Sequence, residues 1–181
     1  MQTTDESMVR EALSRPLARL IDRLDAACIG ASDEIDAAVS AALTEAAAAP
    51  GLLTPEQMQG NPERYARHLL HGDPLGRYSI VSLVWGPGQF SPVHGHYTWC
   101  GYVVVAGRLH EETYLWAGDP KAAVLQNASD RLPGDRRFAH AGLDQIHRLG
   151  NSGAAPAVSI HVYGVDQARV GSHVNRVVKS A

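Results

Sequence analysis

Cysteine is scarce in this chain of 181 residues, which contains only Cys28 and Cys100, far apart in the sequence. Two isolated cysteines exclude the disulfide framework on which small secreted domains depend. Charge of one sign is also lacking, since the formal net charge is −3 and no basic run occurs. A chain without a basic patch has no electrostatic footprint for nucleic acid, so we expect no nucleic-acid partner.

Long hydrophobic runs are absent as well. No apolar stretch approaches the ~20 residues needed to span a bilayer, and the opening MQTTDESMVREA has no apolar signal-peptide core. We therefore expect no membrane partner and a cytoplasmic location. The length and the 45% hydrophobic content suit a single domain over residues 1–181, as a monomer or small homo-oligomer.

The first third of the chain carries apolar side chains at helical spacing. One stripe consists of Leu13, Leu17, Leu20, Ile21, Leu24 and Cys28. Ser14 is the expected N-cap of this helix, because Pro16 fits only its first turn. A second helix is expected after Ser32, and the alanines at 46–49 should end it.

Two shorter segments also carry helix-start signals. Thr54–Gln57 has the form of a capping box with Pro55 at the first helical position. Asn61 should begin another short helix, which Gly72 should end. Together these signals predict a helical N-terminal region over residues 1–72.

From about Arg77 the pattern changes to short runs rich in β-branched and aromatic residues. These runs are RYSIVSLVWG, GYVVVAG, LHEETYLW, AAVLQ and APAVSIHVYG. Turn residues separate them at intervals of roughly 8–12 residues, which is typical of an all-β sandwich or barrel. We predict a β-barrel over residues 75–181, and a barrel of about eight strands can hold one small ligand.

The stretch SPVHGHYTWCGYVVVAG, from Ser91 to Gly107, is the most informative in the chain. It places His94 and His96 two positions apart, and residues i and i+2 of a strand project from the same face. Two imidazoles in that arrangement can bind one metal ion. The same parity predicts that Thr98 and Cys100 line the same cavity.

A metal site in a barrel needs a third ligand from a distant strand. His147, in DQIHRLGN, is the best candidate, and His161, in APAVSIHVYG, is the other. His161 shares a strand face with Ser159 and Tyr163, and this row of hydrogen-bonding groups fits a proton relay better than a ligand set. The other histidines have no such neighbours and are expected to be superficial or structural: His68, His71, His110, His140 and His173.

These positions resemble the two motifs of the cupins. The first motif is carried by Gly88, His94, His96 and Gly107, and the end of the second by His147 and Asn151. The cupin pattern places a glutamate ligand after the second histidine, where this chain has Cys100 or Gly101. Loss of that glutamate leaves three neutral histidines, which is the metal site of the thiol dioxygenases among the cupins.

The wider match agrees with this resemblance. RYARHLL (64–70), VWGPGQFSPVHGH (84–96), IHRLGNSG (146–153) and AVSIHVYG (157–164) are similar to the cysteine dioxygenase and 3-mercaptopropionate dioxygenase family. The resemblance implies a mainly β cupin fold, a double-stranded β-helix or jelly-roll-like barrel, with an N-terminal helical region. It implies a non-haem iron enzyme that oxidises a small carboxylate-bearing thiol with O2 to a sulfinic acid.

The family's site residues carry over by position. The resemblance implies Fe(II) on His94, His96 and His147. It implies an outer triad of Ser159, His161 and Tyr163, with the Tyr163 hydroxyl beside substrate and oxygen.

Substrate choice depends on one further position. Arg67 stands where cysteine-selective members keep an arginine for the substrate carboxylate, whereas mercaptopropionate-selective members usually have glutamine. A buried guanidinium grips a carboxylate with two hydrogen bonds, which glutamine cannot do. Arg67 is expected on a helix near the barrel mouth, and Tyr65 should line the same pocket. Cysteine is therefore the favoured substrate, although the motif segments are closer to the bacterial mercaptopropionate group.

Two positions depart from the family pattern. Cys100 lies near the position at which animal cysteine dioxygenases have a cysteine. In those enzymes that cysteine is joined by a thioether to the tyrosine equivalent to Tyr163, whereas bacterial relatives usually have glycine at the position. We hypothesise that Cys100 faces the cavity and can crosslink to Tyr163. Gly95 stands where relatives mostly have aspartate, and the loss of that carboxylate would loosen the support of the metal ligands.

Two other classes of function remain open. One is a non-catalytic cupin that binds metal and senses or stores a small molecule. The other is a zinc or nickel cupin that catalyses hydrolysis or isomerisation, for which Glu111 and Glu112 are the nearest candidate acids or bases. An all-imidazole site accepts several metals, so the residues alone do not select one.

Overall fold

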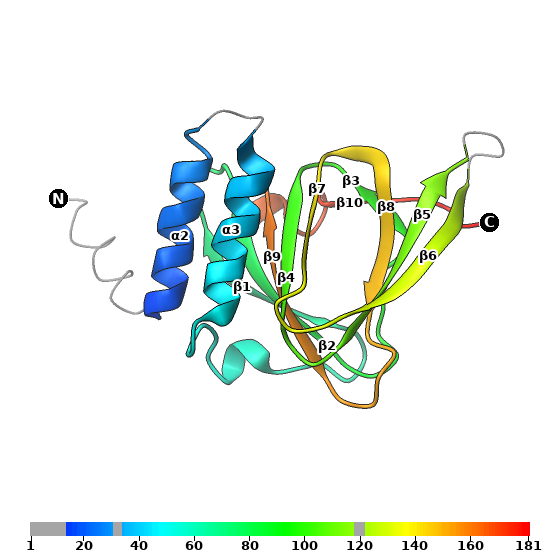
Figure 1. Cartoon of the computed structure of the whole chain (residues 1–181), viewed down its shortest axis with the longest axis horizontal. Helices are drawn as coiled ribbons and strands as arrows, with labels where there is room; N and C mark the ends of the chain where they lie inside the picture. Colours follow the sequence, from blue (N-terminus) through cyan, green and yellow to red (C-terminus); the bar gives the residue numbers. More distant parts are fainter. Residues whose placement is uncertain (1–13, 31–33, 118–121) are drawn as a thin grey trace.

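A computed structural model describes residues 14–30, 34–117 and 122–181 of the chain. Among these residues, helices α2 (Arg15–Ala27) and α3 (Ile35–Ala48) precede a set of antiparallel strands and pack against one side of them (Figure 1). The mainly β class with helices ahead of a two-sheet barrel is therefore confirmed. No helix among the described residues has the length and apolar character required to cross a bilayer.

The strands form two five-stranded sheets. In spatial order the first consists of β1 (Ala66–Gly72), β2 (Ser79–Trp85), β9 (Ala157–Tyr163), β4 (Cys100–Ala106) and β7 (Arg136–Ala139). The second consists of β10 (Asn175–Val177), β3 (His94–His96), β8 (Gly142–Gly150), β5 (Leu109–Trp116) and β6 (Ala123–Arg131). Short 3-10 turns lie at Glu56–Met58 (η2) and Gln167–Arg169 (η3).

Local helix signals are largely confirmed. The Ser14 hydroxyl accepts the backbone N–H of Leu17 at 3.3 Å and caps α2, with proline in the first turn. The leucines and the isoleucine of the predicted stripe are buried on α2, whereas Cys28 is half-buried and caps the C-terminal end of the helix. The expected first member, Leu13, lies outside the described residues, as does Ser32. The alanine run ends α3 at Ala48, as predicted.

The capping box at Thr54 also forms. The Thr54 N–H donates to Gln57 Oε1 at 3.0 Å, and the Gln57 N–H donates to Thr54 Oγ1 at 3.4 Å. The helix that it starts is only the 3-10 turn η2.

The helix predicted between Asn61 and Gly72 is wrong. The Asn61 side chain accepts the N–H groups of Glu63 and Arg64, at 2.9 and 3.3 Å, but these bonds form a turn, and the chain then enters strand β1. β1 pairs along its length with β2, so the ladder hydrogen bonds override the local helix signal. The barrel thus begins at Ala66 rather than at residue 75, and the helical region is correspondingly shorter.

Strands β2 and β9 are buried at every position, because each has the helices on one side and the barrel interior on the other. Ile80 and Ile160 face the core shared with α2 and α3, whereas Val81 and Tyr163 face the interior core. The two-residue period of a strand therefore divides one continuous apolar run between two cores. The chemistry-bearing side chains of β9 fall on the inward set.

Gly101 sets the distance between helix α3 and strand β4. A Cβ at this position would lie 2.8 Å from Val39 Cγ1 and 3.1 Å from Leu43 Cδ1, both on α3. The absence of a side chain lets the helix lie close to the strand whose next residue inward is Cys100.

We expect Gly101→Ala to lower the free energy of unfolding by about 1–3 kcal/mol, because the added methyl overpacks the contact with α3. Denaturant or thermal unfolding measures the change. Gly171→Ala is the matched control, since a Cβ there meets no atom within 4 Å. Equal stability of the two variants would contradict this account of the helix contact.

Candidate metal centre

Three buried histidines from two strands converge in the barrel interior. His94 and His96 lie on β3, and β8 places His147 directly opposite His94 in the antiparallel register. One ligating nitrogen of each lies within 4.8 Å of the others. The histidines are 5%, 2% and 9% exposed, in that order. The structure thus brings His147, and not His161, to the predicted pair.

Hydrogen bonds hold two of these imidazoles in a defined tautomer. The Nδ1–H of His94 donates to the carbonyl of Pro92 at 2.8 Å, and that of His147 donates to Glu111 Oε1 at 2.9 Å. Because each Nδ1 carries the proton, each Nε2 keeps its lone pair for a metal. Among the described residues, the buried Nδ1 of His96 has no hydrogen-bond partner.

Burial keeps the paired histidines unprotonated. Desolvation, followed by the nearby His147, lowers the pKa of His94 to about 3 and that of His96 to about 2. At neutral pH His94 and His96 are neutral nitrogen donors, and no carboxylate from the described part of the chain belongs to the cluster. A compact set of three imidazoles fits a divalent transition metal such as iron, zinc or nickel.

Glu111 is the buried acid beside the centre, and only 2% of it is exposed. Besides His147, its carboxylate accepts the Nε–H groups of Arg131 at 2.7 Å and Arg137 at 3.2 Å. Burial alone would raise the pKa of Glu111, but the His147 hydrogen bond and the two arginines lower it to about 2. The carboxylate is therefore ionised at neutral pH.

The sequence indicates Glu111 only as an acid or base for hydrolysis or isomerisation and does not predict its hydrogen bond to His147. The signal was available in LHEETYLW, where inward-facing Leu109 shares its strand face with Glu111. Glu112 lies on the other face, where it accepts the Tyr114 hydroxyl at 2.5 Å and pairs with Arg148 at 3.5 Å. The two adjacent glutamates thus have different environments.

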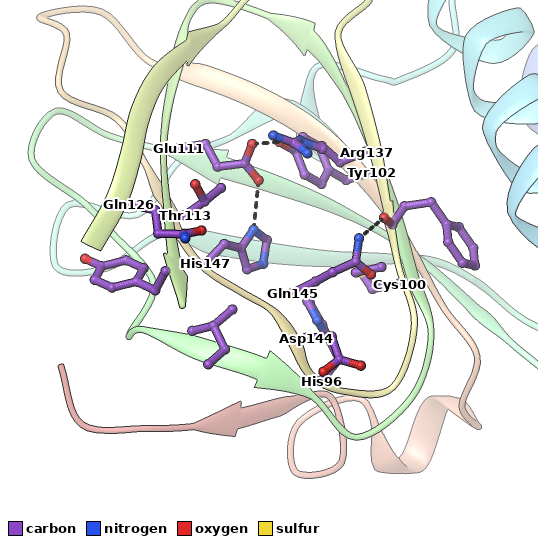
Figure 2. A pocket seen from close by; sticks show the side chains of 14 residues that line it. His96, Cys100, Tyr102, Glu111, Thr113, Gln126, Arg137, Asp144, Gln145 and His147 are labelled. Carbon is purple, nitrogen blue, oxygen red and sulfur yellow. Dashed lines mark hydrogen bonds and ion pairs between the residues drawn. The ribbon is translucent and has the colours of Figure 1, made fainter. Parts of the chain in front are cut away.

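Two cavities border the histidine cluster. The smaller, of about 20 Å³, is lined by the histidines, Cys100, and several of the predicted site residues: Tyr65, Arg67, His161 and Tyr163. The larger, of about 210 Å³, is lined by His96 and His147 together with residues of β5, β7 and β8 (Figure 2). Glu111 and Arg137 line the larger cavity, where Figure 2 shows their contact and that of Glu111 with His147.

The row on β9 forms a buried chain of polar groups. The indole N–H of Trp85 donates to Ser159 Oγ at 3.0 Å, and that hydroxyl lies 2.9 Å from His161 Nε2, to which it can donate its own proton. The His161 and Tyr163 rings are 5.8 Å apart. Desolvation lowers the pKa of His161 and raises that of Tyr163, so the imidazole is neutral and the phenol keeps its proton.

Arg67 reaches the smaller cavity from an element other than the predicted helix. It lies on strand β1 and is exposed rather than buried, with its Nη1 donating to the Val170 carbonyl at 3.4 Å. Tyr65, just before the strand, stacks on Trp85 with ring centroids 4.5 Å apart. Both side chains line the cavity, at the end where Arg67 meets solvent.

Cys100 faces the cavity, as predicted, but Thr98 does not. Cys100 is buried and stands directly opposite Tyr163 in the pairing of β4 with β9. Residues 97–99 belong to no strand, so the parity of His96 does not continue through them. The Thr98 hydroxyl instead donates to the Gly164 carbonyl at 2.5 Å.

The departure at Gly95 has a steric cause. A Cβ at this position would collide with the carbonyl oxygen of Gly142 on β8. An aspartate cannot be accommodated here without moving β3 away from β8. The remaining histidines lie outside the cluster and are partly or fully exposed: His68, His71, His110, His140 and His173.

Comparison with known proteins gives a consistent match. A model of the family described as cysteine dioxygenase type I matches residues 8–170. Cysteine dioxygenase type 1 from Homo sapiens is 33% identical over 105 residues, 55% of this chain and 50% of that protein. The protein of the same name from Danio rerio is 26% identical over 122 residues, 60% of each chain. The chain thus spans about half the length of the mammalian relatives that it matches.

The chain is also similar to several solved structures. TT1209 from Thermus thermophilus is 22% identical, covering 62% of this chain and 95% of its own, with a TM-score of 0.49. Recombinant oxalate oxidase in complex with glycolate is 17% identical, covering 63% of this chain and 59% of its own, with a TM-score of 0.47.

We expect the metal-free protein to lose stability as the pH falls from 6.5 toward 3. Histidines of the unfolded chain take up protons below about 6.5, while His94 and His96 in the fold stay neutral, so the unfolded state binds more protons. Each histidine contributes up to about 1.4 kcal/mol per pH unit. Denaturant unfolding across this range should show a shallower slope for His94→Asn than for wild type. A slope that changes equally in the control His173→Asn, at an exposed histidine, would contradict the assignment.

Proposed function

The chain belongs to the cysteine dioxygenase type I family, and we propose that it is a thiol dioxygenase that oxidises a small carboxylate-bearing thiol to its sulfinic acid with O2. Cysteine is the favoured substrate and Fe(II) the metal. The observation that carries this proposal is the buried cluster of His94, His96 and His147, to which no carboxylate of the described residues belongs.

The ligand set suits a thiol substrate. Three neutral imidazoles leave the full charge of a divalent ion uncompensated, which favours binding of an anionic thiolate. Iron(II), when bound, would supply open coordination positions and the electrons that activate dioxygen. The protein contributes the fixed geometry of the three nitrogens and a cavity from which bulk water is largely excluded.

Two residues are proposed to bind the rest of the substrate. Arg67 lines the cavity, and its Nη1 donates to the Val170 carbonyl at 3.4 Å, which leaves other guanidinium N–H groups to bind a substrate carboxylate. Tyr65, stacked on Trp85, would form the adjacent wall. A cavity of about 20 Å³ has room for one water-sized occupant, so substrate entry requires side chains such as Arg67 to move.

The polar row on β9 is proposed to supply a proton donor, the Tyr163 hydroxyl, and to hold it in position. Tyr163 keeps its phenolic proton at neutral pH, because burial raises its pKa, and can therefore donate to an oxygen-bearing group beside it. His161 is held by Ser159, which is held in turn by the Trp85 indole. These two hydrogen bonds fix the His161 ring beside Tyr163 without placing a charge in the cavity.

Oxygen uptake tests the function. The purified protein, loaded anaerobically with Fe(II), should consume O2 when cysteine is added and release cysteine sulfinic acid. His147→Ala should abolish both, while His173→Ala, outside the centre, should retain them. Binding of thiol without oxygen uptake would instead support a non-catalytic cupin. Equal or faster turnover of 3-mercaptopropionate would overturn the assignment of cysteine as the favoured substrate.

We also propose that Cys100 and Tyr163 can form a thioether. Formation would join Cys100 Sγ to a ring carbon of Tyr163, break one S–H and one C–H bond, and pass two protons and two electrons to O2. Peptide mapping after turnover should show a linked pair lighter by two hydrogen atoms, absent from Cys100→Ser. An unlinked pair after repeated turnover would exclude the crosslink.

A further inference from the structure

The three histidines differ in what holds the nitrogen that faces away from the metal position. The Nδ1–H of His94 donates to a neutral backbone carbonyl, that of Pro92. The Nδ1–H of His147 donates to the carboxylate of Glu111, which is charged and buried. A carboxylate acceptor makes an imidazole a stronger electron donor than a carbonyl does, so His147 is electronically distinct from its partner.

The two oxygens of the Glu111 carboxylate have different hydrogen-bond partners. Oε2 accepts the Nε–H groups of Arg131, at 2.7 Å, and Arg137, at 3.2 Å. Oε1 is left for the Nδ1–H of His147, at 2.9 Å. With one oxygen bound by two guanidinium groups, rotation of the carboxylate is restricted and Oε1 stays directed at the imidazole.

The elements that contribute these groups make the arrangement rigid. Glu111 is on β5, Arg131 on β6 and His147 on β8, all strands of the second sheet, whereas Arg137 is on β7 of the first sheet. The Arg137–Glu111 pair therefore ties the two sheets together beside the larger cavity (Figure 2). The position of His147 depends on contacts with three other strands.

We propose that Glu111 is a positioning residue of the metal centre, resting on the proposed function for the metal itself. It holds His147 in the tautomer that presents Nε2, and it supplies one negative charge to the centre through a hydrogen bond. The proposed ligands are all histidines, and the carboxylate of Glu111 lies one hydrogen bond beyond one of them, His147. Glu111 acts only through His147 and touches neither metal nor substrate.

Metal binding, rather than turnover, tests this proposal. Co(II) affinity of the metal-free protein would be measured by titration calorimetry, and the Co(II) absorption spectrum recorded in parallel. We expect Glu111→Gln to weaken binding by about 10–100-fold and to shift the visible bands, because a neutral amide is a weaker acceptor for His147. Glu112→Gln, the adjacent glutamate on the opposite face, is the matched control and should keep wild-type affinity and spectrum.

Two further variants separate charge from packing. Glu111→Asp keeps the negative charge and should bind Co(II) more tightly than Glu111→Gln. If Glu111→Gln does not fold, as judged by circular dichroism, Arg137→Gln is tested in its place. This arginine is half exposed, and its replacement removes one of the two hydrogen bonds from arginine to Glu111 Oε2. We expect Arg137→Gln to cause a smaller but measurable weakening.

The outcomes are distinguishable. Wild-type affinity and spectrum in folded Glu111→Gln would overturn the positioning role alone. Equal weakening in the Gln and Asp variants would overturn the role of charge and leave only packing. Failure of the wild-type protein to bind Co(II), or wild-type Co(II) affinity in His147→Ala, would overturn the proposed metal centre as well.

Discussion

The antiparallel contact between β3 and β8 is the constraint on which this molecule depends. It sets His147 opposite His94, and it requires glycine at position 95, where any Cβ would meet the Gly142 carbonyl. A short strand that carries two histidines of the cluster and a long strand that carries the third thus approach each other closely. The cluster is consequently a property of strand pairing rather than of any mobile loop.

The rest of the fold surrounds this contact with two kinds of support. Strands β2 and β9 are buried on both faces, so the helices on one side hold the inward row of Ser159, His161 and Tyr163 in place from behind. On the other side, Glu111 connects His147 to two arginines and, through Arg137, to the opposite sheet. Apolar packing supports the side of the proposed proton donor, and ion pairs support the third histidine.

Several expectations failed for the same physical reason, namely that local patterns do not contain pairing partners. The cap at Asn61 is real, yet the residues after it find an open edge on β2 and become a strand that carries Arg67. Thr98 was assigned to the cavity by strand parity, but the chain turns between β3 and β4 and the parity is lost. Gly95 departed from the family pattern without a visible cause until β8 was placed beside it.

By itself the sequence determined the mainly β class with helices ahead of it, the Ser14 cap of α2 and the paired histidines, because these depend on periodicity and spacing along one segment. It also carried the family resemblance, through four separate motifs. The tertiary structure alone brought His147 within reach of the pair, as the resemblance had implied, and it alone showed Glu111 bound to His147. Those two results depend on strand register and on which sheet lies opposite, and such contacts join residues that are far apart in the chain.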